Sequence, residues 1–235
     1  NTRDEDIISI KWRWGPRTWL EKVEFQPGGT IDLQWIPASV REFDISYLSM
    51  NGRIETAALP NGLETFRACD NKLRGKLSLA ELPRELAVFE VSRNRLRGTL
   101  ALDALPESLI ELRLNCNRFS GTVDLTRLPP AIRTIDISIN KLKGVVDLTQ
   151  LPADIETCNI SFNKLSGSVD LTKLPKGIGE LCLSNNNFRG RTSFSHLPRS
   201  LRMLNIGNTN LRGTVKIRPG LKVCALGSRV VVKMR

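Results

Sequence analysis

The sequence has few of the residues that catalytic and metal sites need. It contains one histidine, and its five cysteines form no Cys-x-x-Cys pair. His196 stands just before Leu197-Pro198 with no evident partner in the sequence, so two-histidine metal sites are excluded and a Ser-His-Asp triad is only formally available. No Gly-rich phosphate-binding loop occurs. We therefore expect no enzyme activity, no metal or cofactor, and no small-molecule substrate.

Two further absences bear on location. No apolar run approaches the roughly 18 residues of a membrane span, so no membrane span is expected. The cysteines are odd in number and unclustered, which argues for a reducing compartment: Cys69, Cys116, Cys158, Cys182 and Cys224. The chain starts at Asn1 without a signal peptide, which indicates a trimmed terminus or a removed targeting segment. We expect an intracellular protein, with a mitochondrion or another organelle as one such compartment.

Acidic residues are missing from the last part of the chain. Residues 181–235 contain 11 Lys and Arg and no Asp or Glu, whereas residues 1–180 contain 24 residues of each sign. This asymmetry predicts that the C-terminal end contacts RNA or another polyanion, and a basic surface kept for solubility is the alternative. The predicted contact residues are Arg189, Arg191, Arg199, Arg202, Arg212, Lys216, Arg218, Lys222, Arg229 and Lys233.

What the chain has in abundance is a repeat of 23 residues, which runs eight times without insertion from Ile36-Pro37. Counted from the residue before proline, apolar residues recur at positions 1, 5, 8, 10, 15, 19 and 21. Position 13 is Asn in six units and position 17 is Gly in all eight. The alternation around positions 8 and 10 predicts a short strand. Such strict self-similarity predicts a solenoid in which neighbouring units share one core.

The invariant positions suggest local roles. The asparagine at position 13 has two donors and an acceptor with which to satisfy turn backbone groups inside the solenoid. The glycine suits a positive φ or a close approach, and the proline suits the start of a short helical or 3-10 turn on the outer side. Asp124, Asp147 and Asp170 recur at position 20, where we expect each carboxylate to cap the following turn rather than to bind a cation.

The pattern LxxLxLxxNxLxG resembles the leucine-rich repeat family over about residues 20–226. Its LxGx[IV] portion resembles the plant-type subclass, in which an extra short strand follows the glycine. The Leu-Pro opening and the VDLTxLP run resemble leucine-rich proteins of kinetoplastids and related protists. The resemblance implies an α/β-type solenoid that is predominantly β, with short 3-10 or helical turns on its convex side, curved as a right-handed horseshoe.

The ends depart from the consensus in ways that indicate caps on a single solenoid domain. Residues 1–35 are predicted to be an N-terminal cap, which ends in a half repeat at 29–33 and includes Trp12, Trp14 and Trp19. Residues 36–219 are the eight repeats. Residues 220–235 are predicted to be C-terminal capping strands, with Leu221, Cys224 and Leu226 in a shortened ninth unit and a closing strand at 230–232.

A second charge pattern follows the repeat. Positions 14 and 16 are basic at ten of their sixteen sites and acidic at none. Stacking places equal positions of successive units side by side, so these residues predict a basic ridge along one edge of the strand face. We expect such a ridge to bind along a phosphate backbone. Ordinary decoration of solvated loops is the alternative. Besides Arg189 and Arg212, the ridge contains Lys72, Arg74, Arg95, Arg97, Arg118, Lys141, Lys143 and Lys164.

The concave strand face carries small and mixed polar residues, which suit a protein partner better than a nucleic-acid groove. Ile139 and Phe162 occupy position 12 of neighbouring units and either form an apolar patch or pack against the strand edge. The residues predicted to contact a protein are Asp136, Ile139, Asn159, Phe162 and Cys182.

Three functions remain open at this stage. The leading hypothesis is a non-enzymatic scaffold that binds protein partners within a large assembly, where its basic end contacts RNA, as in an organellar ribosome or its assembly intermediate. The second is a receptor-type domain that binds a protein or peptide on its concave face. The third is a substrate-recognition domain cut from an enzyme, since the resemblance extends to domains that serve ligases and kinases.

Overall fold

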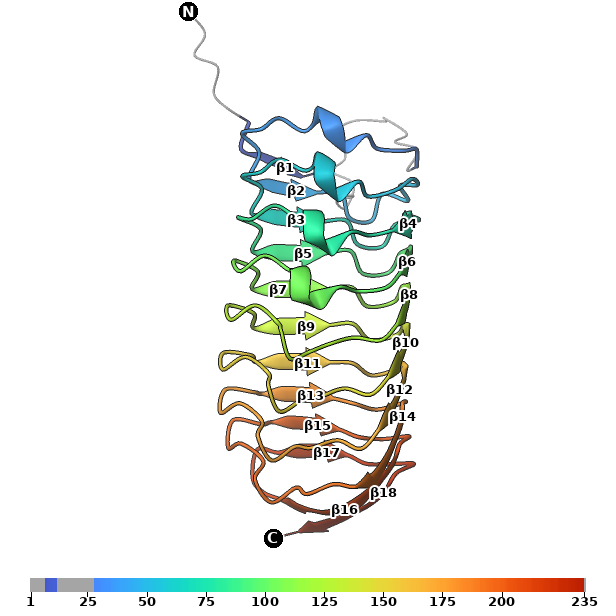
Figure 1. Ribbon diagram of the computed structural model, residues 1–235, viewed down its shortest axis with the longest axis vertical. Coiled ribbons are helices and arrows are strands. Elements are labelled where there is room, and N and C mark those ends of the chain that lie inside the picture. Colours follow the sequence, from blue (N-terminus) through green and yellow to red (C-terminus); the bar gives the residue numbers. More distant parts are fainter. Residues whose placement is uncertain (1–6, 12–27, 235) are drawn as a thin grey trace, which may run out of the picture.

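The computed structural model describes residues 7–11 and 28–234 of the chain. These residues form a solenoid of stacked turns, one for each 23-residue unit (Figure 1). Trp12, Trp14 and Trp19, which the sequence assigns to the N-terminal cap, lie outside the described residues. Within those residues no helix combines the length and apolar character that crossing a membrane requires.

Two parallel sheets run along the solenoid. The first, which we call the concave sheet after the predicted concave face, contains ten strands, β1 (Ser9–Lys11), β2 (Glu42–Asp44), β3 (Thr65–Arg67), β5 (Val88–Glu90), β7 (Glu111–Arg113), β9 (Thr134–Asp136), β11 (Thr157–Asn159), β13 (Glu180–Cys182), β15 (Met203–Asn205) and β17 (Lys222–Cys224). The second, the lateral sheet, contains β4 (Arg74–Lys76), β6 (Arg95–Gly98), β8 (Arg118–Gly121), β10 (Lys141–Gly144), β12 (Lys164–Gly167), β14 (Asn187–Arg191), β16 (Asn210–Ile217) and β18 (Arg229–Met234).

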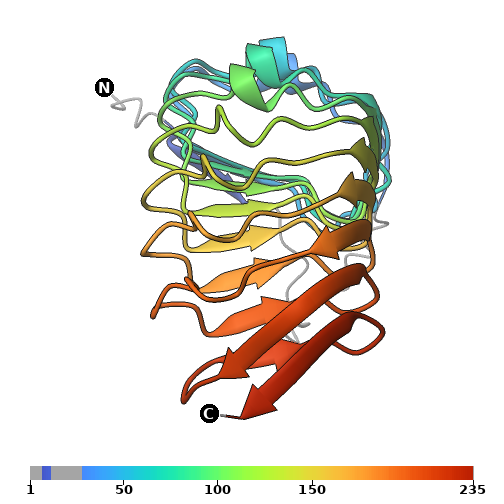
Figure 2. The ribbon, with the colours of Figure 1, turned by 60° about the horizontal axis from the view of Figure 1, so that its bottom comes forward.

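The remaining side of each turn is helical only in the first units. Short 3-10 helices η1 (Leu33–Trp35), η2 (Thr56–Ala58), η3 (Leu79–Glu81) and η4 (Leu102–Ala104) stack there, and later units have open turns in their place (Figure 2). After this segment the proline at position 2 of each repeat opens a turn. The N–H of the residue three positions later donates to the proline carbonyl, as Leu63 donates to Pro60 at 3.0 Å. The expected solenoid, predominantly β with short helical turns, is confirmed.

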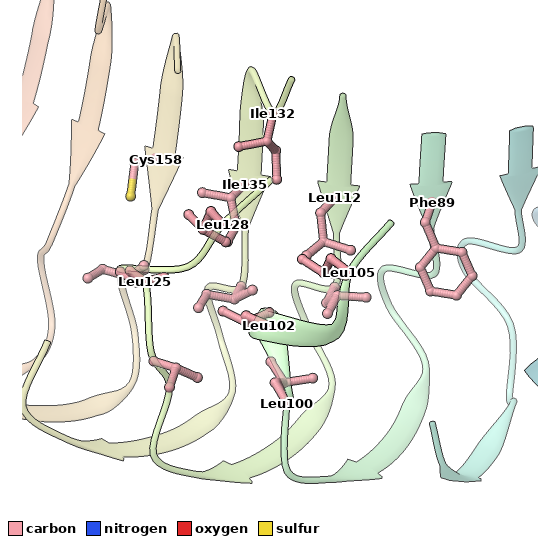
Figure 3. Packing of buried hydrophobic residues seen from close by; sticks show 14 of the residues in the cluster. Phe89, Leu100, Leu102, Leu105, Leu112, Leu125, Leu128, Ile132, Ile135 and Cys158 are labelled. Atoms are coloured by element: carbon pink, nitrogen blue, oxygen red, sulfur yellow. The ribbon is translucent and has the colours of Figure 1, made fainter. Parts of the chain in front are cut away.

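The core is a set of columns, because the concave sheet pairs residues 23 apart. Phe66 lies opposite Phe89, and the rings of Phe43, Phe66 and Phe89 stack with centroids 5.8 and 5.5 Å apart. Smaller residues continue this column through Leu112, Ile135 and Cys158, which point into the interior in Figure 3. Each unit thus buries its apolar face against its two neighbours, as a solenoid requires.

Asparagine side chains tie the turns together. Asn94 Nδ2 donates to the Ala68 carbonyl of the preceding unit at 2.8 Å, and its Oδ1 accepts the Leu73 N–H at 3.0 Å. The same contacts recur from Asn71 to Asn186. Position 17 glycines have φ between 88° and 151°, a region that favours glycine. Both roles predicted from the repeat, the asparagine ladder and the left-handed glycine, are confirmed.

At the ends the solenoid departs from its regular pattern. The half repeat bridges Thr30 to Asn51 and buries Leu33. At the other end β17 continues the concave sheet and β18 pairs with β16. Leu226, assigned to the core of a ninth unit, is instead 91 % exposed, because Gly227 turns the chain back towards β18. The extra strand of each middle unit also differs from expectation, since it ends at the glycine rather than following it, as in Arg95–Gly98.

Candidate functional site

The outward side chains of the lateral sheet form a continuous cationic surface, which we call the lateral basic face. Along the lateral strands, buried apolar residues alternate with exposed cations. In β6, for example, Leu96 is buried while Arg95 and Arg97 face solvent. The exposed cations are Lys72, just before β4, and Arg74, Lys76, Arg95, Arg97, Arg118, Lys141, Lys143, Lys164, Arg189, Arg191, Arg212, Lys216, Arg229 and Lys233. The predicted ridge therefore lies on the face of a separate sheet and not along the edge of the concave strands.

The register of the lateral sheet sets cations directly opposite one another. Strand partners are offset so that position 16 of one unit faces position 14 of the next, as in Arg97 opposite Arg118 and Lys143 opposite Lys164. Further opposed pairs are Arg74 and Arg95, Lys76 and Arg97, Arg191 and Arg212, Arg212 and Arg229, and Lys216 and Lys233. Like charges in directly opposed positions destabilise a sheet. The fold tolerates this repulsion repeatedly along one surface.

No cation of this face forms an ion pair with a described carboxylate. The ion pairs between described residues involve Lys11, Arg67, Arg93, Arg113 and Arg133, all outside the lateral basic face. The other outward residues of the lateral strands are mostly short and polar, among them Ser120, Ser166, Asn187, Asn210 and Thr214. None is aromatic. Near the C-terminal end the face is hollowed between β14, β16 and β18, where Arg189, Arg191, Arg212 and Arg229 line a shallow depression.

The structure places only some of the ten C-terminal basic residues on the lateral basic face. Six belong to the lateral basic face: Arg189, Arg191, Arg212, Lys216, Arg229 and Lys233. Arg199 and Arg202 lie in the turn before β15, and Lys222 begins β17 of the concave sheet. Arg218 has an internal role, since its guanidinium donates to the carbonyls of Pro198 and Leu201. The ten residues therefore do not form one binding end as the sequence suggests, because the chain wraps around the solenoid.

The concave sheet holds its polar residues in mutual hydrogen bonds. Asp136 Oδ1 accepts from the Ser138 N–H at 2.9 Å and from the Ser138 hydroxyl at 2.6 Å. Asn159 Nδ2 donates to the other carboxylate oxygen of Asp136 at 3.3 Å. Cys182 is only 8 % exposed, and its thiol lies 3.4 Å from a Glu180 carboxylate oxygen. Of the predicted concave contacts, Asp136 and Asn159 are half-buried and Cys182 offers little surface.

Ile139 and Phe162 stand out from this surface. They are 48 % and 51 % exposed, and their φ angles are 52° and 53°. Asn185 and Asn208 occupy the same position 12 in later units with similar angles. Asparagine tolerates this left-handed conformation, whereas a β-branched residue there is strained. The fold places two large apolar side chains in a strained and exposed position where they add nothing to the core.

Groups suited to chemistry are engaged in structural contacts. The Asp124, Asp147 and Asp170 carboxylates each accept the N–H and hydroxyl of the threonine two residues on, and these bonds hold their pKa values below the ordinary value. This confirms their turn-capping role. His196 does have a partner, because its Nδ1 lies 2.8 Å from Ser195 Oγ, and both residues are exposed. The five cysteines are free, and burial raises the pKa of Cys158 to about 12.

Sequence reasoning missed two properties of the lateral basic face. Lys76 and Arg191 stand at position 18, two residues beyond the predicted ridge on the same side of the strand. Extending the alternation of positions 14 and 16 by one step would have found them. The continuation of the ridge onto Lys216, Arg229 and Lys233 was also missed, because the last two lateral strands are longer than the lateral strands of the earlier units.

Comparisons with known proteins reveal likeness in structure. No family model matches the sequence, and no curated protein matches it. A plant ice-binding protein aligns with a TM-score of 0.69 and 20 % identity, over 87 % of this chain and 69 % of its own. The leucine-rich repeat domain of APL1B aligns with a TM-score of 0.60 and 16 % identity, over 92 % and 70 % of the two chains.

A third neighbour is the ectodomain of the membrane receptor kinase GASSHO1/SCHENGEN3 from Arabidopsis thaliana, in complex with CASPARIAN STRIP INTEGRITY FACTOR 2. It aligns with a TM-score of 0.54 and 17 % identity, over 88 % of this chain and 34 % of its own. The chain thus spans about a third of that receptor ectodomain.

Proposed function

Because this chain is a leucine-rich repeat solenoid, we propose that it is a non-enzymatic interaction module of a larger assembly, in which the lateral basic face binds RNA. The observation that carries the proposal is the set of opposed cation pairs, none of which forms an ion pair with a described carboxylate. Repulsion between these cations is relieved when a polyanion lies along the face, so binding and the charge pattern are explained together. An intracellular compartment that contains RNA, including an organelle, belongs to the same proposal.

The dimensions of the face suit a nucleic-acid backbone. Seven spacings of about 4.8 Å separate β4 from β18, which makes the face about 34 Å long, enough to span one turn of a nucleic-acid duplex. Arginine, lysine, serine, threonine and asparagine side chains are the usual donors to phosphate oxygens. Single-stranded nucleic acids are commonly held by stacking on aromatic residues, which this face lacks. These features favour a duplex region of RNA.

The test measures the binding of a fluorescent 16-base-pair RNA duplex as a function of salt. Each phosphate contact to a duplex contributes about −0.9 to the slope of log Kobs against log salt concentration, a coefficient established for B-form DNA that we apply to RNA as an approximation. The variant Lys141→Gln with Lys143→Gln removes two central cations, both exposed on β10. We expect its slope to be shallower by about 2 and its affinity to fall at low salt.

The matched control removes two cations from another side of the solenoid. Arg199→Gln with Arg202→Gln causes the same change in net charge, and both residues are exposed in the turn before β15. We expect this variant to keep the slope of the parent protein. Equal loss in both variants would show that only net charge matters, and no duplex binding at low salt would refute the RNA proposal.

Ile139 and Phe162 favour a second candidate function, the binding of a protein or peptide on the concave side. The GASSHO1/SCHENGEN3 neighbour was solved with a partner, and strained exposed residues often serve binding. Replacing both residues with Asn keeps the left-handed backbone while removing the apolar surface. If this function holds, the double variant loses a protein partner that the parent retains in pull-downs from native cells, while RNA binding is unchanged.

The ice binding named for one neighbour is not part of our proposal. Recognition of a crystal lattice requires rigid, evenly spaced groups. The lateral basic face of this solenoid carries long, flexible charged side chains, and the lysine ammonium groups among them are strongly hydrated.

A further inference from the structure

The C-terminal end of the lateral sheet differs from the rest of the solenoid. Pairing between β16 and β18 covers six residue pairs, from Arg212 opposite Arg229 to Ile217 opposite Met234. Other lateral pairs cover two or three. β18 occupies the outermost place among the described strands, so its far side has no strand beside it (Figure 1). The sheet thus ends in its most extended pair of strands.

The outer edge of β18 is open for pairing. In a parallel sheet alternate residues direct their N–H and C=O groups to one neighbour and the intervening residues direct theirs to the other. About half of the backbone groups of β18 therefore face away from β16. An edge of this kind is a template for a further strand. Its sequence, Arg-Val-Val-Val-Lys-Met, is rich in the β-branched residues that favour strands.

The side of β18 that faces the interior is also incompletely covered. Val215 of β16 is fully buried, whereas Val232, its partner in β18, is 39 % exposed and Met234 is 85 % exposed. An added strand that presents apolar residues on this side would cover them. The interior side of the occupant is therefore apolar.

The outward side of β18 determines the charge of the occupant. Arg229 and Lys233 point outward beside Arg212 and Lys216, with Val231 between them. In a second copy of this chain, β4 is already covered, because Lys72 and Arg74 donate to the carbonyls of Met50 and Gly52 and Thr30 bridges Asn51. Such a copy, stacked end to end, would present residues 28–30 to β18, and Gly28, Gly29 and Thr30 have no acidic side chain to pair with Arg229 and Lys233. A strand with acidic residues opposite Arg229 and Lys233 would instead complete two favourable cross-strand pairs.

From these observations we infer that β18 is the docking site for an extended acidic segment of another protein, which adds a strand to the lateral sheet. The segment carries acidic residues four positions apart, opposite Arg229 and Lys233, and apolar residues in between on the interior side. This site shares Arg229 and Lys233 with the lateral basic face and adds recognition groups that the RNA proposal does not use, namely the edge backbone and the apolar residues Val232 and Met234.

The experiment uses two labelled peptides of equal charge. Their central sequences are Glu-Val-Thr-Val-Glu and Glu-Pro-Thr-Pro-Glu, and proline removes backbone N–H groups and disfavours sheet pairing. We expect the first peptide to bind at least tenfold more tightly in fluorescence anisotropy, and to slow amide hydrogen exchange in β18. Equal binding of the two peptides, or unchanged exchange in β18, would overturn the inference.

Charge variants locate the site. Arg229→Glu with Lys233→Glu should lower the affinity for the valine peptide at least tenfold, and a Lys-Val-Thr-Val-Lys peptide should then bind this variant, which shows that it is folded. The matched control, Arg74→Glu with Lys76→Glu at the other end of the same face, should stay within twofold of the parent. Equal loss in this control contradicts a site at β18.

Two measurements separate this inference from its alternatives. Lys141→Gln with Lys143→Gln should weaken RNA binding and leave peptide binding intact, so either proposal can fail without the other. Sedimentation equilibrium should show a monomer at micromolar concentration. Self-association that Arg229→Glu with Lys233→Glu abolishes would identify a second copy as the occupant and overturn the inference.

Discussion

Removing one asparagine from the ladder should weaken the solenoid at a defined point. Asn140 Nδ2 donates to the carbonyls of Leu114, Ile137 and Ser138 at 3.0 to 3.1 Å. Its Oδ1 accepts the Phe119 N–H at 3.0 Å. In Asn140→Ala this N–H, next to a fully buried ring, has no acceptor.

The expected loss follows from that orphaned donor. Leaving a buried backbone N–H unsatisfied costs about 1–3 kcal/mol. With about 1.4 kcal/mol for each factor of ten, local opening around Phe119 should become roughly 5- to 140-fold more frequent. Because each unit contacts only its neighbours, the change should concentrate in the units that contain Leu114 and Asn140.

Native-state hydrogen exchange of the Phe119 amide measures this opening directly, and urea unfolding measures the overall loss. Asn187→Ala is the control, since Asn187 is an exposed residue of the same type on β14, where a substitution should change stability by less than about 0.5 kcal/mol. If Phe119 exchanged at the parent rate in Asn140→Ala, the ladder would not hold the turns together as argued.

Three further predictions concern strain, pH and thiol reactivity. Ile139→Asn should raise the free energy of unfolding by about 1 kcal/mol in urea titrations, since it relieves a left-handed β-branched residue, and Asn185→Ile should lower it by a similar amount. The pKa of Asp147 is lowered first by the Thr149 hydroxyl, so its contribution to stability is present above the unfolded pKa and is lost as pH falls below about 4. In Thr149→Val, NMR titration should show this pKa rising, and an unchanged value would refute the assignment. Ellman's reagent should titrate two half-exposed thiols quickly, Cys116 and Cys224, and the other three only after unfolding, because burial raises the pKa values of those three to about 12.

Most of the fold was predictable because one 23-residue pattern is repeated eight times. A periodic core position such as Leu112 or Ile135 has the same neighbours in every turn, so its burial follows from the pattern alone. The asparagine and glycine positions were predictable for the same reason, since each has a specific backbone requirement.

The site was less predictable because it depends on how the turns are offset. Sequence spacing places Arg97 and Arg118 at different positions of their units, yet the two-residue offset of the lateral sheet sets them opposite each other. Sequence spacing also could not distinguish the roles of Arg218 and Lys216. The Arg218 guanidinium donates to two backbone carbonyls, whereas Lys216 faces solvent on the lateral basic face. The exposure of Leu226 arises at Gly227, where the chain turns back towards β18, and the repeat pattern does not predict this turn.

Sedimentation of the tagged protein from its native cells, with and without RNase, tests the central proposal most directly. We predict that the parent protein migrates in a heavy complex that RNase dissolves, and that Lys141→Gln with Lys143→Gln shifts it towards light fractions. Light migration of the parent protein under both conditions, or a heavy complex that RNase leaves intact, would contradict the assignment of the lateral basic face to RNA.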